Sequence, residues 1–441
     1  MKKIVLSTIS ALALSSVANA SEIKLYADAA GQVFTTPAEG RVLLDTTLTT
    51  ENQKKNITIV NSKSPDFALG KETHINMKFV AQDNPDMWLK AGVRIQGTFE
   101  NRASDYVDST KSDTSVNDAY LRRVRFEVAA GFNKYTSFVM DVRNDKANYK
   151  DDGEKEFNVG DAYVAIKKPY GSSLVNFKLY RGKIDVSRTE TVKSARVLHY
   201  DRPQVADEAA QFITHNRRGT NIQMYGDWNK KVHYQVAIGD GVYSGKFKDA
   251  SGSSFDGDLT QKNFFYGGKL VLSPFDGWEE TSRTETYFGK GKHFEVGAAY
   301  WKSPDIAYDN GVVSQTIDHT LVNLEMSAHY KGLFVQAEYF DFDGVVKDWG
   351  SAETGKSNGW YATGEYVMPE LNYLAPFVRH ESWDKYDGEK GYALVSNMVG
   401  ANMYFQGNTI KAGLTYQEDK YSSQVGNKTD TRVKMTTQFF F

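Results

Sequence analysis

The sequence predicts an all-β protein: a transmembrane antiparallel β-barrel of about 16 strands, with short periplasmic turns and long external loops. Three observations lead to this prediction. The N-terminus has the pattern of an export signal, the following chain divides into strand-length runs of alternating polarity, and the C-terminus is a strand that ends on aromatic residues. A single closed sheet accounts for all three, and no linker divides the chain into smaller domains.

The first element is a segment with the pattern of a secretory signal peptide. Lys2 and Lys3 supply positive charge, residues 4–17 are mostly apolar, and Ala18-Asn19-Ala20 provides the small residues that signal peptidase requires. A membrane anchor would need about 20 apolar residues, which this segment lacks. We therefore expect residues 1–20 to be a signal peptide and residues 21–86 to be an N-terminal extension, either periplasmic or lumenal.

The composition agrees with an exported barrel. Mean hydropathy is only -0.52 although aromatic residues make up 13% of the chain, as expected when alternate strand residues face lipid and water. Cysteine is absent, which excludes disulfides and thiolate chemistry and is typical of an exported chain that avoids oxidisable thiols. The net charge of -2 gives no indication of a nucleic-acid partner, which usually requires a strongly basic face.

The barrel itself is expected at residues 87–441. Alternating polarity predicts strands at 88–100, 118–129, 133–144, 158–168, 173–183, 217–229, 231–240, 262–273, 292–302, 319–330, 332–343, 358–368, 371–382, 392–405, 407–417 and 431–441. Each is near the roughly 9–11 residues that a tilted strand needs to cross a bilayer. The connections alternate between short and long, apart from residues 273–291, which are long where a short turn is due. We interpret that segment as a periplasmic insertion.

The last strand carries a second targeting signal. Residues 433–441 alternate in polarity and end in three phenylalanines, which resembles the terminal signature that outer-membrane barrel assembly recognises. An even number of strands returns this end to the side where the barrel began, so it is expected to pair with the strand near 88–100. The predicted location is the outer membrane of a Gram-negative bacterium, with membrane lipid around the barrel.

Alternation also separates two faces of each strand. In residues 319–330, for example, Leu324 and Met326 alternate with Asn323, Glu325 and Ser327. A face that is charged along its whole length needs water beside it, whereas a soluble β-sandwich turns its apolar face inward. Only the export signal and the size favour the barrel. Aromatic pairs near strand ends are assigned to interfacial girdles: Tyr300 and Trp301, Trp360 and Tyr361, and Tyr404 and Phe405.

The charges on the polar faces predict the lining of the pore. By parity the cations facing inward are Arg123, Arg125, Arg143, Lys178, Arg217, Lys269, Lys411, Arg432 and Lys434. The acidic residues on the same faces are Glu127, Asp141, Asp161, Glu295, Glu325, Glu338 and Glu365. The first half of the barrel is therefore basic, and strands nine to twelve are acidic. The alternative is that many of these groups neutralise one another in lumenal salt bridges.

The loop at 184–216 is the best candidate for a constriction, since loops of this length in compact proteins are usually functional. It holds Arg188 and Arg196 together with further basic, acidic and histidine residues. Folded inward, its arginines would join those of the strands, and a planar guanidinium binds phosphate bidentately without losing its charge. Folded outward, the loop would be a solvated surface.

No catalytic constellation is present in the sequence. There is no His-x-x-x-His pair on a helix, no Gly-x-Ser-x-Gly nucleophile elbow and no calcium-loop spacing. We therefore expect no enzyme activity, no metal and no cofactor.

Five segments, in order, resemble the phosphate-selective porin O/P family: DAYLRRVRF at 118–126, VGDAYV at 159–164, RGKIDVSR at 181–188, GLFVQAEY at 332–339 and GWYATGEY at 359–366. The resemblance implies a trimeric porin whose lumen carries a ladder of arginines and a few central lysines. It adds Lys183 and supports Arg123, Arg125 and Arg188 as anion-binding positions.

We thus predict an outer-membrane porin for passive diffusion of small hydrophilic solutes, which prefers anions of the phosphate type and assembles as a homotrimer. The candidate pore-lining residues are Arg123, Arg125, Arg143, Lys178, Lys183, Arg188, Arg196 and Arg217. Two departures from the family pattern keep a general or cation-leaning porin open as the alternative. No proline follows Lys183, and the later strands are acid-rich. A barrel enzyme or adhesin with a plugged lumen is the third hypothesis.

Overall fold

The computed structural model describes residues 25–27, 33–34, 38–39, 42–44, 57–60, 77–81, 83–107, 111–147, 156–214, 217–241, 249–253, 258–280, 282–309, 311–350, 353–422 and 426–440. The chain divides into two compact units, residues 1–58 with 81–85, and residues 59–80 with 86–441. The expected signal peptide at 1–20 lies outside the described residues, and its removal stays a prediction, as does the boundary between extension and barrel at residue 86.

The first unit contains a small antiparallel sheet with the strand order β2-β1-β3. Its strands are β1 (Leu25–Ala27), β2 (Val33–Phe34) and β3 (Val42–Leu44). A further short strand, β4 (Ile57–Val60), follows along the chain. In the second unit, β5 (Met77–Ala81) pairs with the start of β6, with Met77 opposite Ala91 and Val80 opposite Trp88.

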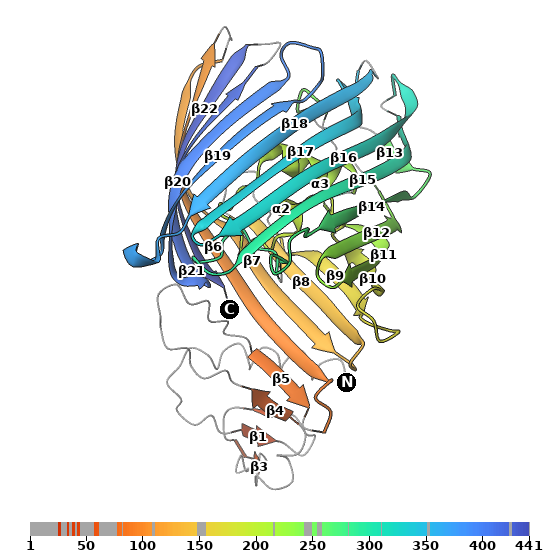
Figure 1. Ribbon diagram of the computed structural model, residues 1–441, viewed down its shortest axis with the longest axis vertical. Helices are drawn as coiled ribbons and strands as arrows, with labels where there is room; N and C mark the ends of the chain where they lie inside the picture. The colour runs from red at the N-terminus through yellow and green to blue at the C-terminus, as the bar shows by residue number, and fades with distance from the viewer. Residues whose placement is uncertain are drawn as a thin grey trace. The chain divides into compact units, whose positions relative to one another are not determined.

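The second unit is a closed antiparallel barrel of 16 strands, as the sequence predicts (Figure 1). Its first half consists of β6 (Trp88–Val107), β7 (Thr114–Gly131), β8 (Thr136–Ala147), β9 (Asn158–Ile166), β10 (Asn176–Gly182), β11 (Gly219–Trp228), β12 (Val232–Gly239) and β14 (Phe265–Leu272). The short β13 (Asp258–Gln261) precedes β14, and both pair with β15.

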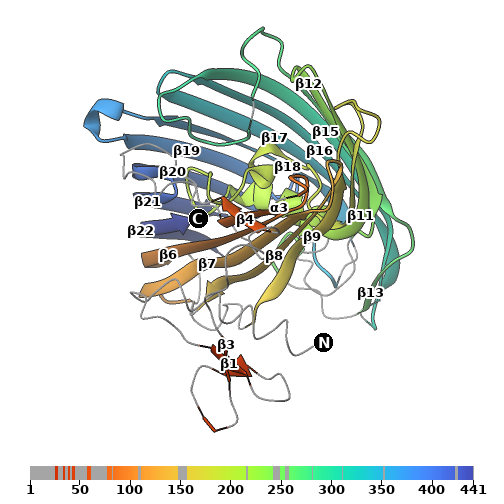
Figure 2. The ribbon, with the colours of Figure 1, turned by 90° about the horizontal axis from the view of Figure 1, so that it is seen from below.

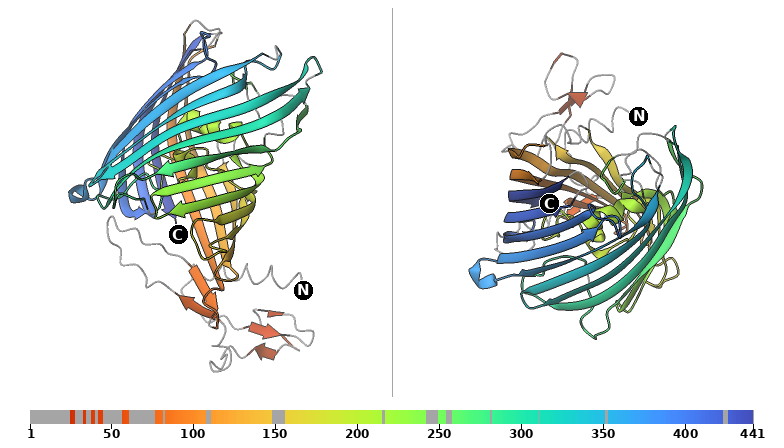
Figure 3. Two further views of the ribbon diagram at one scale, coloured as in Figure 1. Left: turned by 45° about the vertical axis from the view of Figure 1, so that its right-hand side comes forward. Right: turned by 90° about the horizontal axis from the view of Figure 1, so that it is seen from above.

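The second half of the barrel consists of the eight strands from β15 to β22 (Figure 3). They are β15 (Lys292–Asp309), β16 (Ser314–Tyr330), β17 (Leu333–Val346), β18 (Thr354–Tyr366), β19 (Leu374–Asp384), β20 (Ala393–Asn408), β21 (Ile410–Tyr421) and β22 (Asn427–Phe440). β22 pairs with β6 from Asn427 opposite Val107 to Phe440 opposite Arg94, which closes the sheet. Several strands run past the predicted bounds, because pairing continues beyond the part that alternation identifies.

The polar faces of the strands point into the barrel. On β16, Asn323, Glu325 and Ser327 are buried, whereas Leu324 and Met326 are 50% and 41% exposed. The apolar outer face suits membrane lipid, and the closed sheet leaves no strand edge without a hydrogen-bonding partner there.

The expected aromatic girdle is only half present, because neighbours on a strand point to opposite faces. Tyr300 and Trp360 are exposed on the outer face, as a girdle requires. Their neighbours Trp301 and Tyr361 are buried inside the barrel, and Tyr404 is buried there as well. These three residues therefore belong to the packing of the lumen and not to the membrane interface.

Two helices lie in the long connection between β10 and β11: α2 (Arg188–Thr191) and α3 (Gln204–Phe212). A 3-10 turn, η2 (Pro369–Leu371), joins β18 to β19. Within the described part of the chain, no helix is both long and apolar enough to span a bilayer.

Candidate functional site in the barrel lumen

The connection between β10 and β11 crosses the inside of the barrel. We call residues 184–216 the lumenal loop, of which 184–214 are described. Its ends are attached to β10 and β11, yet Ser194 accepts hydrogen bonds from Arg94 and Gln96 on β6. Other loop carbonyls accept from Asn402 on β20 and Lys411 on β21. A segment that starts at β10 and bonds to inward side chains of β6, β20 and β21, on the other side of the barrel, lies within the lumen, and Figure 2 shows α3 inside the ring of strands.

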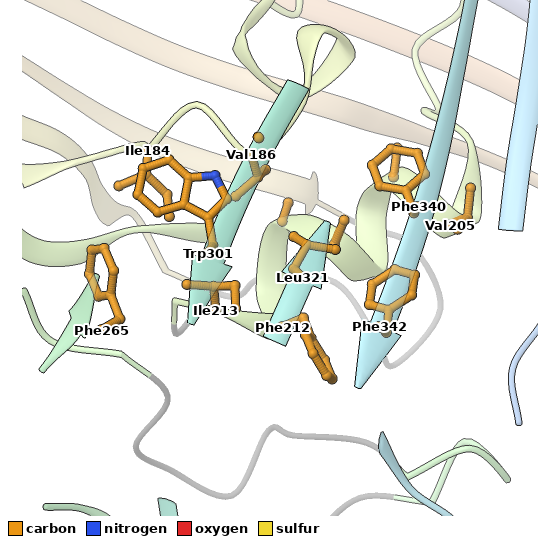
Figure 4. Close-up of a cluster of buried hydrophobic side chains, with 14 of the residues drawn as sticks. Ile184, Val186, Val205, Phe212, Ile213, Phe265, Trp301, Leu321, Phe340 and Phe342 are labelled. Atoms are coloured by element: carbon orange, nitrogen blue, oxygen red, sulfur yellow. The ribbon is translucent and has the colours of Figure 1, made fainter. Parts of the chain in front are cut away.

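An apolar cluster fixes one side of the lumenal loop. In α3 the apolar residues Val205, Ala206, Ala209, Ala210 and Phe212 recur on one face, and all of them are buried. They pack with inward aromatic and aliphatic residues of β15 to β19 (Figure 4), among them Trp301, Leu321, Phe340, Phe342, Tyr361 and Trp383. The ring of His319 stacks on Phe212 at 4.1 Å between ring centroids. These inward aromatic residues thus form a binding surface for the helix.

A second segment packs against the lumenal loop. Residues 273–291, where a short turn was expected, place Glu280 against Arg188 in a bidentate ion pair with distances of 2.6 and 2.9 Å. Arg283 pairs with Asp185 at 2.6 Å, and Glu285 accepts the backbone N–H of Leu198 at 2.7 Å. The interpretation of this connection as a periplasmic insertion is therefore wrong, since its described residues supply partners for the loop inside the barrel. We call residues 273–291 the inner segment.

The inner segment and the loop contain carboxylates that remain ionised. Burial alone would raise the pKa of Glu280, but Arg188, His293 and Tyr287 together lower it more, so that the pKa falls to about 2. The side chain of Asp201 is 29% exposed, and Lys434 and Arg122 hold its pKa well below the ordinary value. Both carboxylates thus stay charged at neutral pH and keep their partners.

Arginines from three adjacent strands lie side by side on the other wall. Arg94 on β6 is paired in register with Arg125 on β7, which is in turn opposite Arg143 on β8. We call these three the arginine row. Arg94 and Arg143 are buried, at 2% and 4% exposure, and Arg125 forms an ion pair with Asp145 at 3.0 Å. Like charges in register would repel, so the row needs anions beside it.

Arg123 lies next to the arginine row, at the bulge of β7. It is 4% exposed and donates to the side chain of Gln96 at 2.9 Å. Its Nε has no hydrogen-bond partner, and no carboxylate among the described residues lies within ion-pair distance. A buried guanidinium without a carboxylate partner is costly unless an anion reaches it.

A second basic cluster surrounds Glu190 in α2. Its carboxylate contacts Lys183, Arg217 at 2.8 Å and Arg202 at 3.6 Å. Burial alone would raise the pKa of Glu190, but these cations together hold it well below the ordinary value. Lys183 and Arg217 remain 20% and 17% exposed, so this cluster retains contact with solvent.

The eight residues predicted for the pore lining lie at four places in the lumen. Arg123, Arg125 and Arg143 come together at the arginine row, and Lys183 and Arg217 come together at Glu190. Lys178 faces inward between the rings of Tyr163 and Tyr225, at 5.4 and 5.2 Å. The other two face the inner segment, where Arg188 binds Glu280 and Arg196 donates to Ser282.

Several lumenal residues were not among the predicted ones. Arg94 could have been found, because Arg94 and Gln96 alternate with apolar neighbours on β6. Arg122 could not, since a bulge opposite Gln96 and Gly97 turns it inward beside Arg123, where it pairs with Asp201 at 2.8 Å. Sequence patterns give no sign of such an irregularity.

The acidic residues of the later strands have specific partners. Glu325 pairs with Lys269 at 2.6 Å, and Glu338 accepts from Tyr361 and Gln336 at 2.5 and 2.9 Å. Glu365 accepts from Tyr404 at 2.5 Å. These side chains are 8%, 2% and 1% exposed. The acidic wall is therefore covered and not open to a passing ion. No group of metal-ligating side chains occurs in the part of the chain that the structure describes.

A closed 16-strand barrel, polar inside and apolar outside, with a long loop folded into its lumen, defines an outer-membrane channel of the porin class. The sequence profile of the family described as phosphate-selective porin O and P matches residues 89–441. The chain therefore belongs to that family, as the resemblance of its motifs indicates.

Known proteins show the same fold at low sequence identity. The outer membrane channel DcaP of Acinetobacter baumannii aligns with a TM-score of 0.54 and 10% identity, over 82% of this chain and 99% of that one. Salmonella typhi OmpF, solved with daunomycin, aligns with a TM-score of 0.50 and 14% identity, over 80% and 98%. A protein of Aquifex aeolicus described as uncharacterized is 24% identical over 396 residues, which cover 84% of this chain and 91% of its own.

Proposed function

We propose that this porin conducts small hydrophilic solutes passively and prefers anions of the phosphate type. Family and fold imply a channel of the bacterial outer membrane and indicate a channel rather than an enzyme. The preference is supported by one observation above all, the arginine row with Arg123 beside it. Five arginines of β6, β7 and β8 gather there: Arg94, Arg122, Arg123, Arg125 and Arg143.

The geometry of these groups supports an oxyanion ligand. A guanidinium can donate two parallel N–H hydrogen bonds to a phosphate, and adjacent guanidiniums on neighbouring strands provide further donors to the same ligand. Lys183, Lys193 and Arg217 extend positive charge toward solvent, and the side chain of Lys193 is 60% exposed. Carboxylates in the same region reduce the positive electrostatic potential. This favours weak, transient binding of an anion, which a conducting channel requires.

The experiment is a reversal-potential measurement in planar bilayers under a KCl gradient, repeated with phosphate added. Wild type should favour chloride, and phosphate should reduce the chloride current. Arg123→Ala with Arg125→Ala should lower the anion-to-cation permeability ratio by roughly fivefold or more, since one charge at about 4 Å contributes about 1 kcal/mol even in water.

Lys302→Ala is the matched control, because Lys302 lies on β15 beside the inward Trp301 and pairs with Asp318 away from the lumen. It should leave the ratio unchanged. A wild-type reversal potential that strongly favours cations and ignores phosphate would reject the anion preference. The general or cation-leaning porin would then be the correct alternative.

A plugged barrel is the second candidate, favoured by the two segments that occupy the lumen. Adhesins and barrel enzymes need no conducting path, whereas a porin gives discrete current steps in a bilayer. Absence of such steps in pure, heat-modifiable protein would support the plugged barrel.

Export and assembly complete the proposal. We propose that residues 1–20 are removed on export and that three copies assemble into a homotrimer, as the family resemblance implies. The mass of the mature chain and its size in mild detergent measure these two properties directly.

A further inference from the structure

Three glutamates of the barrel wall hold the lumenal loop by its backbone. Glu325 on β16 accepts the N–H of Arg188 at 2.7 Å, and Glu338 on β17 accepts that of Thr189 at 2.9 Å. Glu381 on β19 accepts the N–H of Val205 at 2.6 Å. All three side chains are buried, at 8%, 2% and 1% exposure. The same loop is thus bound at two places, one in each helix.

These backbone donors are ones that the helices cannot satisfy themselves. The first N–H groups of a helix have no intrahelical acceptor, and a side chain at the N-cap usually accepts one of them. In α3 the N-cap is Pro203, which makes no side-chain hydrogen bond to the helix. Glu381 supplies the missing acceptor from the opposite wall. A carboxylate is a stronger acceptor than a neutral group, and it also interacts favourably with the positive end of the helix.

Two of these glutamates have further partners on the barrel wall. Lys269 neutralises Glu325, and Glu338 also accepts from Asn323, Gln336 and Tyr361. Arg379 lies on the same strand as Glu381 and donates to the carbonyl of Asp201 in the loop. The negative charges therefore face the loop and not a passing ion.

We propose that Glu325, Glu338 and Glu381 are positioning residues, which keep the lumenal loop in place and so maintain the anion preference although they are acidic. The inference rests on the proposed function for its selectivity part only. If only the number of charges mattered, removal of any lumenal carboxylate would increase the anion preference. If these glutamates position the loop, a variant that removes the acceptor oxygen should decrease the anion preference.

Glu381 offers the clearest test, since glutamine keeps an acceptor oxygen and alanine does not. Glu381→Gln should behave like wild type, with a small shift toward anions from the lost charge. Glu381→Ala should raise the single-channel conductance and lower the anion preference. Asp419→Asn is the matched control, because Asp419 is a buried carboxylate on β21 that binds Gln417 and Arg432, both on strands. It should resemble Glu381→Gln.

A second readout reports the position of the loop without relying on current. The chain has no cysteine, so a single one can be introduced at Thr214, which follows α3 and is 1% exposed with an unpartnered hydroxyl. In a Thr214→Cys background, Glu381→Ala should raise the rate of thiol modification roughly fivefold, the shift that loss of a helix cap produces. Glu381→Gln should leave the rate near that of the parent.

The outcomes separate the two proposals. Equal effects of Glu381→Ala and Glu381→Gln on conductance and labelling would overturn the positioning role, whatever the selectivity of the wild type. A wild type without anion preference would overturn the proposed function, and the conductance and labelling results would still test the positioning role. If Glu381→Ala fails to form a heat-modifiable barrel, the pair Glu338→Ala and Glu338→Gln carries the same comparison.

Discussion

The two walls of the lumen treat the loop between them in different ways. On the acidic wall, β15 to β20, apolar side chains such as Phe340 and Phe342 alternate with carboxylates that bind the loop. On the basic wall, β6 to β10, the contacts with the loop are polar and few, among them Arg94 with Ser194 and Arg122 with Asp201. One wall anchors the loop, and the other presents charge.

The physical reason lies in what each wall can bury. Apolar surface gains free energy when a helix covers it, by about 25 cal/mol per Å², and carboxylates can be buried when backbone N–H groups satisfy them. Guanidiniums need anions in a buried site, and the loop offers few to the basic wall. A lumen with equal numbers of charges can therefore still be selective, because the wall that the loop covers no longer interacts with solutes.

Removing α3 should have the largest effect, because the loop would no longer cover the acidic wall. If residues 203–214 are replaced by a short Gly-Ser linker, the acidic wall becomes exposed and the lumen widens, since 16-strand barrels enclose an aqueous channel. Single-channel conductance should rise several-fold, and the anion preference should fall toward neutrality. An unchanged conductance would mean that the loop does not limit the path.

A smaller effect on the position of the loop is expected from a substitution that crowds the contact between α3 and β18. A Cβ on Gly359 of β18 would lie 2.9 Å from Val205 Cγ2 and 3.0 Å from Trp383 Cδ1, which is too close for normal contact. Gly359→Ala should therefore destabilise the docked loop by about 1–3 kcal/mol, as overpacking usually does. The measurement is current noise together with the Thr214→Cys labelling rate.

Gly364→Ala provides the control on the same strand. The nearest atoms to its added Cβ lie at 3.5 and 3.8 Å, which is ordinary contact. If both glycine variants behave alike, the close approach between Val205 and β18 does not hold the loop.

The smallest effect is expected at the edge of the basic wall. Lys178→Met keeps a side chain of similar shape between Tyr163 and Tyr225 but removes the charge. The anion-to-cation ratio should fall by less than roughly fivefold, because Lys178 contributes one charge and the arginine row contributes several. Lys167→Met, an exposed lysine just after β9, should change nothing. If the anion-to-cation ratio falls more than in the double arginine variant, the main contact with the anion lies at β10.

The barrel could be predicted almost entirely from the sequence. Alternation in residues 319–330 identified the faces of β16 and its end at Tyr330 but missed residues 314–318, and the aromatic end of β22 indicated where the sheet closes. Local side-chain order carries this information, since each strand must place apolar groups toward lipid and polar groups toward water. The same reasoning identified the inward cations of β7 and β8, and applied to β6 it would also have identified Arg94.

The roles of individual lumenal residues were decided by the tertiary structure. Arg188 has the sequence context of an anion-binding arginine, yet the inner segment provides Glu280 as its partner. Arg122 points inward only because of a bulge in β7. For most strand residues, the alternation of the sequence alone distinguished those that face lipid from those that face water, although it misplaced Trp301, Tyr361 and Arg122. Which lumenal charges meet one another, and which remain for a solute, depends on contacts between segments more than 90 residues apart, such as Arg188 with Glu280 and Glu325, and no local pattern encodes such contacts.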